Sequence, residues 1–336
     1  MLMNLVSFFV LIASVSCKSA EPAAEVAESQ ALDAKSTGPE KSQSTAVLVF
    51  GDQGTGDEGQ KTVAKAMTKI CLQGLCGQDA LVLGDNFYPT GVKDQNDTQF
   101  REKFELPYQA LRVWGMKFHV VLGNHDYGFT YLKNPLRQNG SFQAQIDYTS
   151  KGTGWHMPAR YYKFSTGAVD YFALDTNGPN DCTVFDDAQE QWLRLGLQES
   201  KSLWKVVFAH HPVFSAGEHG DTALLVKKLL PILCEHADLY LSGHDHDLQV
   251  LGARGATDCP ARKKTPLIFG VSGGGGKVPR VVTKKHPNGI FYYAGLGFHR
   301  VEFGERSFKV TVHRGEDGEI LFEQDFAGGL KPRATL

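Results

Sequence analysis

Asp85 and Tyr88 are the two residues whose types and spacing most directly indicate metal chemistry in this sequence. They follow the apolar run Leu81-Val82-Leu83-Gly84, so a carboxylate and, three residues later, a phenol come at the end of a predicted strand. The two oxygens of a carboxylate can bind two cations at once, and a strongly Lewis-acidic ion can hold a tyrosine as phenolate. The pair therefore predicts a binuclear metal site in which Asp85 bridges the ions.

Other residues of metal-ligand type follow other predicted strands. From Ala46 onward the 336-residue chain alternates β-rich and helix-like runs, which indicates one α/β layered domain. Ligands of open α/β sheets bind outside the carboxyl ends of the strands, so side chains at those ends are expected to converge. The candidates at strand ends are Asp52, Asp85, Asn124, His210, His244 and His246.

The predicted elements follow from apolar runs and local stop signals. Pro231 is expected to interrupt or kink the helix over 224–234, and Asp186 is a predicted N-cap. The segment 127–167 is less regular. The predicted strands are 47–50, 81–83, 118–122, 169–174, 204–209, 239–241, 267–271, 298–303 and 308–313, and the first predicted helix is 58–71.

Taken one at a time, these motifs have ordinary structural explanations. Gly51-Asp52-Gln53-Gly54 is typical of a turn, and Gly123-Asn124-His125-Asp126 is typical of a polar loop. His244 and His246 are a stronger signal, because imidazoles two residues apart in extended backbone lie on one side. Only the joint occurrence of the motifs therefore favours a metal site.

Two glycine-rich patterns are weaker candidates. Gly54-x-Gly56-x-x-Gly59 matches the dinucleotide fingerprint, but Asp57 and Glu58 bring negative charge to the place a pyrophosphate would occupy. The run 273–276 precedes Lys277 but lacks the Ser or Thr of a phosphate-binding loop, so close backbone packing beside the site is the better interpretation.

In this order, the motifs resemble those of the purple acid phosphatases within the calcineurin-like metallophosphoesterase superfamily, closest to the small tartrate-resistant acid phosphatase-like form. The tyrosine of the second motif separates this family from metallophosphoesterases without a purple iron centre. The resemblance covers most of residues 46 to 313 and implies a four-layer αββα sandwich, with two mixed β-sheets flanked by helices, in a single catalytic domain. The five matching blocks are 51–54, 84–88, 123–126, 207–210 and 243–246.

The resemblance also implies how the ligands divide between two ions. Hard oxygen donors suit iron(III), and imidazole with a neutral amide suits a divalent ion such as Fe(II), Zn or Mn. The implied iron(III) ligands are Asp52, Tyr88, His246 and the bridging Asp85. The implied ligands of the divalent ion are Asp85, Asn124, His210 and His244.

His125 and His219 are the catalytic residues that the resemblance implies, orienting phosphate and protonating the leaving alkoxide. The implied function is an exported acid phosphatase that hydrolyses phosphomonoesters by attack of a metal-bound hydroxide. A phosphodiesterase, nucleotidase or phosphoprotein phosphatase with the same two-metal site is the alternative. A binding protein with a vestigial site is disfavoured, because no ligand is missing. His119, His211 and His313 are predicted to be structural.

The N-terminal segment is predicted to lie outside the fold. The apolar run 5–15 is too short to span a bilayer and ends in small residues, which indicates a signal peptide over 1–16. Two outcomes remain open: free secretion, or a bacterial lipoprotein acylated at Cys17, periplasmic or membrane-tethered. Residues 17–44 have the composition of a disordered linker, the catalytic domain is predicted over 45–327, and 328–336 form a tail.

Net charge and cysteine content limit the expected binding partners and the expected compartment. A formal net charge of -2 gives no global attraction to nucleic acid or to an anionic membrane, so membrane contact is expected only through a lipid at Cys17. The expected substrate is a small phosphomonoester or a phosphoprotein, and the expected state is a monomer. Cys71 and Cys76 could close a small loop in an oxidising compartment, although the sequence leaves the connectivity open.

Overall fold

The computed structural model describes residues 45–128, 141–178, 182–260, 262, 266–282 and 284–327. The predicted signal peptide, linker and tail, together with Cys17, lie outside these residues. In the part of the chain that is described, no helix is both long and apolar enough to cross a bilayer.

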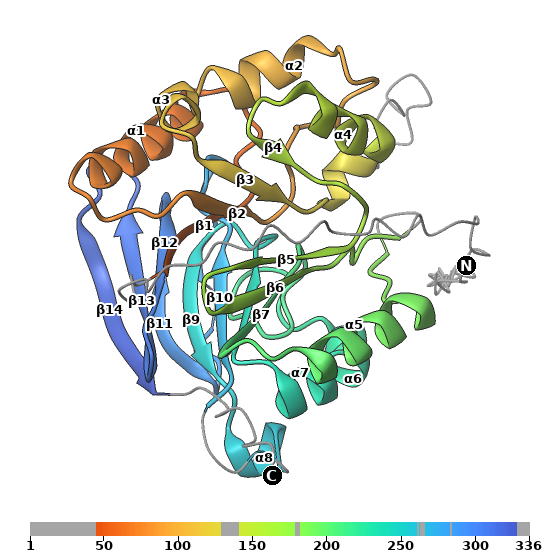
Figure 1. The fold of residues 1–336 in the computed structure, drawn as a ribbon. Helices are drawn as coiled ribbons and strands as arrows, with labels where there is room; N and C mark the ends of the chain where they lie inside the picture. The colour runs from red at the N-terminus through yellow and green to blue at the C-terminus, as the bar shows by residue number, and fades with distance from the viewer. Residues whose placement is uncertain are drawn as a thin grey trace, which may run out of the picture. The chain divides into compact units, whose positions relative to one another are not determined.

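Two seven-stranded β-sheets lie at the centre of the described fold, and helices cover their outer faces (Figure 1). This is the four-layer αββα sandwich expected from the sequence. In the first sheet β1 to β4 run parallel, and β12 to β14 add an antiparallel edge. Its strands, in spatial order, are β14 (Ile320–Ala327), β13 (Ser307–Arg314), β12 (Gly297–Phe303), β1 (Thr45–Phe50), β2 (Asp79–Val82), β3 (Lys117–Val120) and β4 (Trp155–His156).

The second sheet has the same mixed character. Strands β6, β7, β8 and β10 run parallel, while β5, β9 and β11 pair antiparallel with their neighbours. Its strands, in spatial order, are β11 (Gly289–Tyr293), β9 (Leu248–Gly252), β10 (Ile268–Ser272), β8 (Leu239–Ser242), β7 (Trp204–Phe208), β6 (Val169–Ala173) and β5 (Tyr162–Thr166).

The helices form the two outer layers. Those over the first sheet are α1 (Glu58–Leu72), α2 (Thr98–Phe100) continued by the π-helix Arg101–Glu105, α3 (Gln109–Val113) and α4 (Phe142–Tyr148). Those over the second sheet are α5 (Asp187–Glu199), α6 (Ala223–Lys228) and α7 (Leu230–His236). The remaining short helices are the 3-10 turns Asn124–Tyr127 and Thr149–Lys151, and α8 (Gly255–Asp258).

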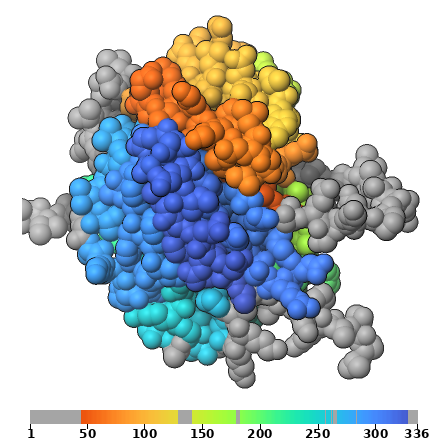
Figure 2. Space-filling model, turned by 90° about the vertical axis from the view of Figure 1, so that its left-hand side faces the viewer, coloured from red at the N-terminus to blue at the C-terminus, as the bar shows by residue number. Residues whose placement is uncertain are grey.

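Helix α1 shows how local sequence and packing agree. Asp57 caps its first turn by accepting hydrogen bonds from the amides of Gly59 and Gln60, and its apolar face is buried. Near its C-terminal end, Lys69 donates to the carbonyl of Asp317 in the β13–β14 turn. Figure 2 shows the C-terminal strands beside α1, so the last hairpin packs against the first helix.

The structure confirms most predicted elements and corrects some boundaries. The predicted helix over 224–234 is two helices, and Pro231 lies in the first turn of α7, where its missing amide costs no hydrogen bond. The segment 127–167 is more regular than expected, because α4, β4 and β5 form there. Strands β9, β11 and β14 were not predicted; β11 and β14 are partly or mostly exposed, whereas β9 is buried and was overlooked.

Candidate metal centre

The predicted ligands converge at the carboxyl ends of the parallel strands, and each sheet supplies one kind of donor. Oxygen donors come from the first sheet, and imidazoles come from the second. The oxygen donors are Asp52 after β1, Asp85 and Tyr88 after β2, and Asn124 after β3. The imidazoles are His210 after β7, and His244 and His246 after β8.

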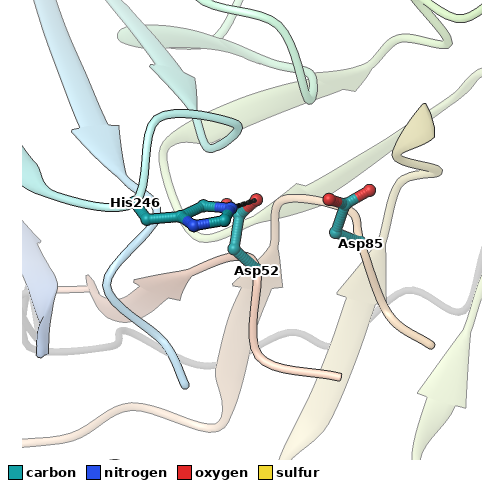
Figure 3. Close-up of side chains that lie close together, drawn as sticks. All are labelled: Asp52, Asp85 and His246. Atoms are coloured by element: carbon teal, nitrogen blue, oxygen red, sulfur yellow. Dashed lines mark ion pairs between the residues drawn. The ribbon is translucent and has the colours of Figure 1, made fainter. Parts of the chain in front are cut away.

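One group of donors gathers around Tyr88. Its hydroxyl lies 3.2 Å from Asp52 Oδ1 and 3.2 Å from His246 Nε2. Donor atoms of Asp52, Asp85 and His246 all lie within 4.8 Å of one another, and all three residues are buried (Figure 3). These four side chains are the ones that the family resemblance assigns to iron(III).

A second group gathers around His210. Its Nε2 lies 2.9 Å from Asn124 Oδ1, 3.1 Å from His244 Nδ1 and 3.5 Å from Asp85 Oδ1. Asp85 therefore belongs to both groups, as a bridging carboxylate must. The structure brings all seven predicted ligands together; their assignment to particular ions stays a prediction.

Backbone strain is concentrated at three of these residues. Asp52, Asp85 and His244 have φ of 59°, 54° and 69°, and they are the only non-glycine residues with positive φ in the part of the chain that is described. Such a conformation costs on the order of 1–3 kcal/mol per residue and persists where the surroundings enforce it. All three residues lie in the loops that directly follow β1, β2 and β8.

Two glycines allow this crowding. A Cβ at Gly123 would lie 2.2 Å from Asp85 Oδ1, and a Cβ at Gly243 would lie 2.5 Å from Asp52 Oδ2. Both distances are far below any normal contact. The two loops can therefore approach the carboxylates this closely only with glycine at these positions.

The imidazoles are in the state that binds metal. Burial lowers the pKa of His210 and lowers that of His244 well below the usual value. Burial, followed by the charge of Arg280, lowers the pKa of His246 to about 3. The three rings are therefore neutral and offer lone pairs over a wide pH range.

Two of the oxygen donors, Asp52 and Tyr88, have raised pKa values. Burial, then the neighbouring Asp85, raises the pKa of Asp52 well above its ordinary value. Burial, then Asp85 and Asp52, raises the pKa of Tyr88 as well. Both groups can be deprotonated together only if cations enter the site, and two metal ions would supply that charge. The donor set therefore fits a binuclear centre.

The two predicted catalytic histidines lie at the more open side of the donors. His125 Nε2 is 3.9 Å from Asp85 Oδ2, and the His125 ring centroid is 4.5 Å from that of Tyr88. The His219 ring lies against His244, with centroids 4.0 Å apart. Side-chain exposures of 24% and 30% leave both rings accessible to a substrate.

Sequence reasoning missed Asp245, which holds His219. Its Oδ1 accepts from the backbone amide of His219 at 3.0 Å and lies 2.8 Å from His219 Nδ1, while Ser215 donates to Oδ2. Because Arg280 can only donate, its contact of 3.1 Å makes His219 Nε2 an acceptor and leaves the Nδ1 proton for Asp245. The signal was available, since Asp245 lies between His244 and His246.

Sequence reasoning also missed Asp126, whose side chain holds two backbone segments in place. Its carboxylate is buried and accepts from the amides of Gly123 at 2.8 Å and Asn86 at 3.0 Å. It thereby ties the loop after β2 to the loop after β3. The sequence signal for a role of Asp126 was its position directly after Asn124 and His125 in the 123–126 motif.

The three histidines predicted to be structural are all buried. His211 lies 2.8 Å from the Thr176 hydroxyl, His119 pairs with Asp79, and His313 lies 2.9 Å from the Gly318 carbonyl. The His211 ring also lies against the ligand His244, with ring centroids 4.6 Å apart.

The sequence matches known phosphoesterases. Residues 45–248 match the model of the family described as calcineurin-like phosphoesterase. The chain is 34% identical over 274 residues to tartrate-resistant acid phosphatase type 5 of Sus scrofa, covering 72% of this chain and 74% of the relative. It is 34% identical over 322 residues to purple acid phosphatase 7 of Arabidopsis thaliana, covering 87% and 86%.

Solved structures share the fold. The Plasmodium protein GAP50, described as the anchor in the inner membrane complex, superposes with a TM-score of 0.68 at 20% identity, covering 85% of this chain and 89% of that one. Purple acid phosphatase PPD1 from yellow lupin seeds superposes with a TM-score of 0.64 at 15% identity, covering 85% and 54%. At these identities, the likeness establishes the architecture.

Proposed function

The chain belongs to the calcineurin-like phosphoesterase family and, within it, to the purple acid phosphatases, and from this premise we propose that it hydrolyses phosphomonoesters in acid at a binuclear Fe(III)–M(II) centre. The observation that carries the proposal is the convergence of seven donors in two groups that share Asp85, with His125 and His219 at their open side. The divalent ion would be Fe(II), Zn or Mn.

The residues divide the work between holding charge and moving a proton. Iron(III) would be held by Asp52, Tyr88 and His246. The divalent ion would be held by Asn124, His210 and His244. Asp85 would contact both ions. When bound, the two ions would neutralise the phosphate and lower the pKa of the attacking water. The strained backbone at three of the ligands supports this role, because it presets their directions before the ions bind.

The protein's own chemistry concerns the leaving group. Hydrolysis breaks the ester P–O bond, joins phosphorus to the oxygen of water, and requires a proton on the departing oxygen. His219, held by Asp245, is the residue to which we assign that proton: Nε2, which accepts from Arg280 in the free protein, would be protonated before it delivers the proton to the departing oxygen. His125, whose Nε2 faces Asp85, would orient the phosphate.

Colour and activity together test the proposal. The purified protein is expected to contain iron and one further metal ion, to show a visible tyrosinate-to-iron(III) band, and to hydrolyse aryl phosphates at acidic pH. Tyr88→Phe should abolish the band. A colourless protein with two divalent ions and full activity would refute the iron assignment.

The substrate class needs a separate measurement. Comparing kcat/KM for an aryl phosphomonoester and the matching diester decides between the proposed reaction and the phosphodiesterase alternative. A higher kcat/KM for the diester would overturn the monoesterase proposal while leaving the metal centre intact.

Export is also part of the proposal. Disulfides Cys71–Cys76 and Cys234–Cys259 support it, because such bonds persist in oxidising compartments. Fractionation of the host, with mass analysis of the mature N-terminus, tests export and distinguishes free secretion from a lipid at Cys17. Recovery of an unprocessed chain from the cytosol would contradict it.

A further inference from the structure

A cationic segment with no part in the proposed chemistry borders the site. Residues 277–280 follow the glycine run after β10, and hydrogen bonds tie them to two ligand residues. The amide of Lys277 donates to the carbonyl of Asp52 at 2.9 Å, and the amide of Arg280 donates to the carbonyl of His246 at 2.9 Å. Both side chains are thus placed at the rim by main-chain bonds.

The two cations point to different parts of the rim. Lys277 Nζ lies 4.6 Å from the centroid of the Tyr88 ring, on the side of the buried donors. Arg280 Nη1 lies 3.1 Å from His219 Nε2, and its side chain is 33% exposed. Arg280 therefore contacts the residue that we assign to the leaving oxygen and also faces solvent.

Arg280 has donor capacity left for a ligand. Nε pairs with Glu218 Oε2 at 3.3 Å and Nη1 faces His219, while Nη2 has no hydrogen-bond partner among the described residues. A guanidinium is always charged, and its planar fork matches the two oxygens of a carboxylate or phosphate. An acidic group on the leaving alcohol would meet this fork just beyond His219.

We propose that Arg280 is a specificity-determining residue that selects phosphomonoesters whose leaving group carries a negative charge. The inference rests on the proposed function, because it uses the leaving-group side defined by His219. It adds a subsite for the part of the substrate that is not transferred.

Glu218 opposes this selection. Its side chain is 61% exposed, and it occupies Arg280 Nε in the absence of substrate. An acidic leaving group must compete with this carboxylate for the guanidinium. Removing the charge of Glu218 should therefore strengthen the selection, whereas removing the charge of Arg280 should weaken it.

A matched pair of substrates isolates the effect. The probes are 4-carboxyphenyl phosphate and 4-carbamoylphenyl phosphate, which are similar in size and differ by one charge in the leaving group. The measured quantity is the ratio of their kcat/KM values in the metal-loaded wild type and in Arg280→Gln, Arg280→Lys and Glu218→Gln. The ratio cancels any general change in metal content or folding.

The expected results have opposite signs. Arg280→Gln should lower the ratio by about fivefold, as expected for a partly exposed ion pair, with most of the change in KM. Arg280→Lys, which keeps the charge but loses the fork, should retain part of the preference. Glu218→Gln should raise the ratio. A ratio that stays constant in both Arg280→Gln and Glu218→Gln would overturn the proposal.

Failure of the inference can be told from failure of the proposed function. If the wild type hydrolyses neither probe, the phosphomonoesterase proposal fails. If it hydrolyses both and Arg280→Gln slows them equally, Arg280 only supports His219 and the leaving-group subsite is refuted.

Discussion

The two sheets contribute different halves of the candidate centre. The loops after β1, β2 and β3 supply only oxygen donors, whose pKa values, where they shift upward, rise because the groups are buried beside one another. The loops after β7 and β8 supply only imidazoles, which burial keeps neutral. The first half therefore needs metal ions to balance its negative charge when it is deprotonated. The imidazoles of the second half are already neutral and can bind metal before any ion is present.

Each half also has one buried supporting carboxylate, and the two do different work. Asp126, beside the first sheet, accepts hydrogen bonds from backbone amides of two ligand loops. Asp245, beside the second, orients the side chain of His219. Mutations at these positions should separate loop stability from catalysis.

The largest effect is expected where the two halves meet. Asp85→Asn removes the charge of the only residue that belongs to both donor groups, so metal content should fall and kcat/KM should drop on the order of 10³-fold or more. Metal analysis and aryl phosphate hydrolysis measure both. Asp325→Asn, an exposed carboxylate on β14, is the matched control and should behave like the wild type.

A smaller effect on catalysis is expected from mutation of Asp245, the supporting carboxylate of the second half. Asp245→Asn removes the charged acceptor of His219, so kcat should fall roughly 10- to 100-fold, as for other residues that orient a functional histidine. The metal content should be nearly unchanged, because Asp245 is not a predicted ligand. Loss of metal without a catalytic defect in the remaining holoenzyme would contradict this division.

Mutation of Asp126, the supporting carboxylate of the first half, should affect stability more than catalysis. In Asp126→Asn, an amide donor replaces one of the oxygens that faces backbone amides, which costs on the order of 1–3 kcal/mol in the free energy of unfolding. Denaturant unfolding of chelator-treated protein measures this cost without contributions from bound ions. Equal stability of the variant and the wild type would show that the two ligand loops are held by other contacts.

The smallest effect concerns a contact between the sheets outside the centre. His119 of β3 stacks on Phe164 of β5 with ring centroids 3.5 Å apart and lies 2.8 Å from Asp79 Oδ1. Burial lowers the pKa of His119, partly offset by Asp79. The folded state therefore binds fewer protons than the unfolded chain below pH about 6.5, so this residue makes stability fall as the pH drops.

His119→Gln should remove that pH dependence. Between pH 7 and pH 5, the Tm of the variant should fall less than that of the wild type, by about 2 °C or less. Thermal unfolding at several pH values, with both proteins in the same metal state, measures the difference. Parallel Tm curves would mean that His119 has the same pKa in the folded and the unfolded protein.

Much of the site could be predicted because its signals are local. Each ligand directly follows an apolar strand or belongs to a short motif, and parallel strands bring their carboxyl ends to one edge. The seven donors could be named on these grounds. Arg280 could not, because it lies 34 positions after His246, and only folding brings it to His219.

The missed strands have a physical explanation as well. Strand β14 is mostly exposed and has three polar residues in a row, 323–325, and β11 is partly exposed, so neither shows the apolar run of a buried strand. Strand β11 pairs with β9, which lies about 40 residues earlier and was not predicted, whereas β14 forms a hairpin with the predicted β13. Backbone hydrogen bonds of this kind leave little trace in local composition.

The sequence by itself determined the kinds of donor, their order and the strands that carry them, because these depend on residue type and local periodicity. Tertiary structure alone decided that oxygen and nitrogen donors come from opposite sheets, and that Asp245 and Arg280 meet at His219. The reason is that register, sheet packing and burial join residues far apart in the chain. Burial, in turn, raises the pKa values of Asp52 and Tyr88 and keeps the imidazoles neutral.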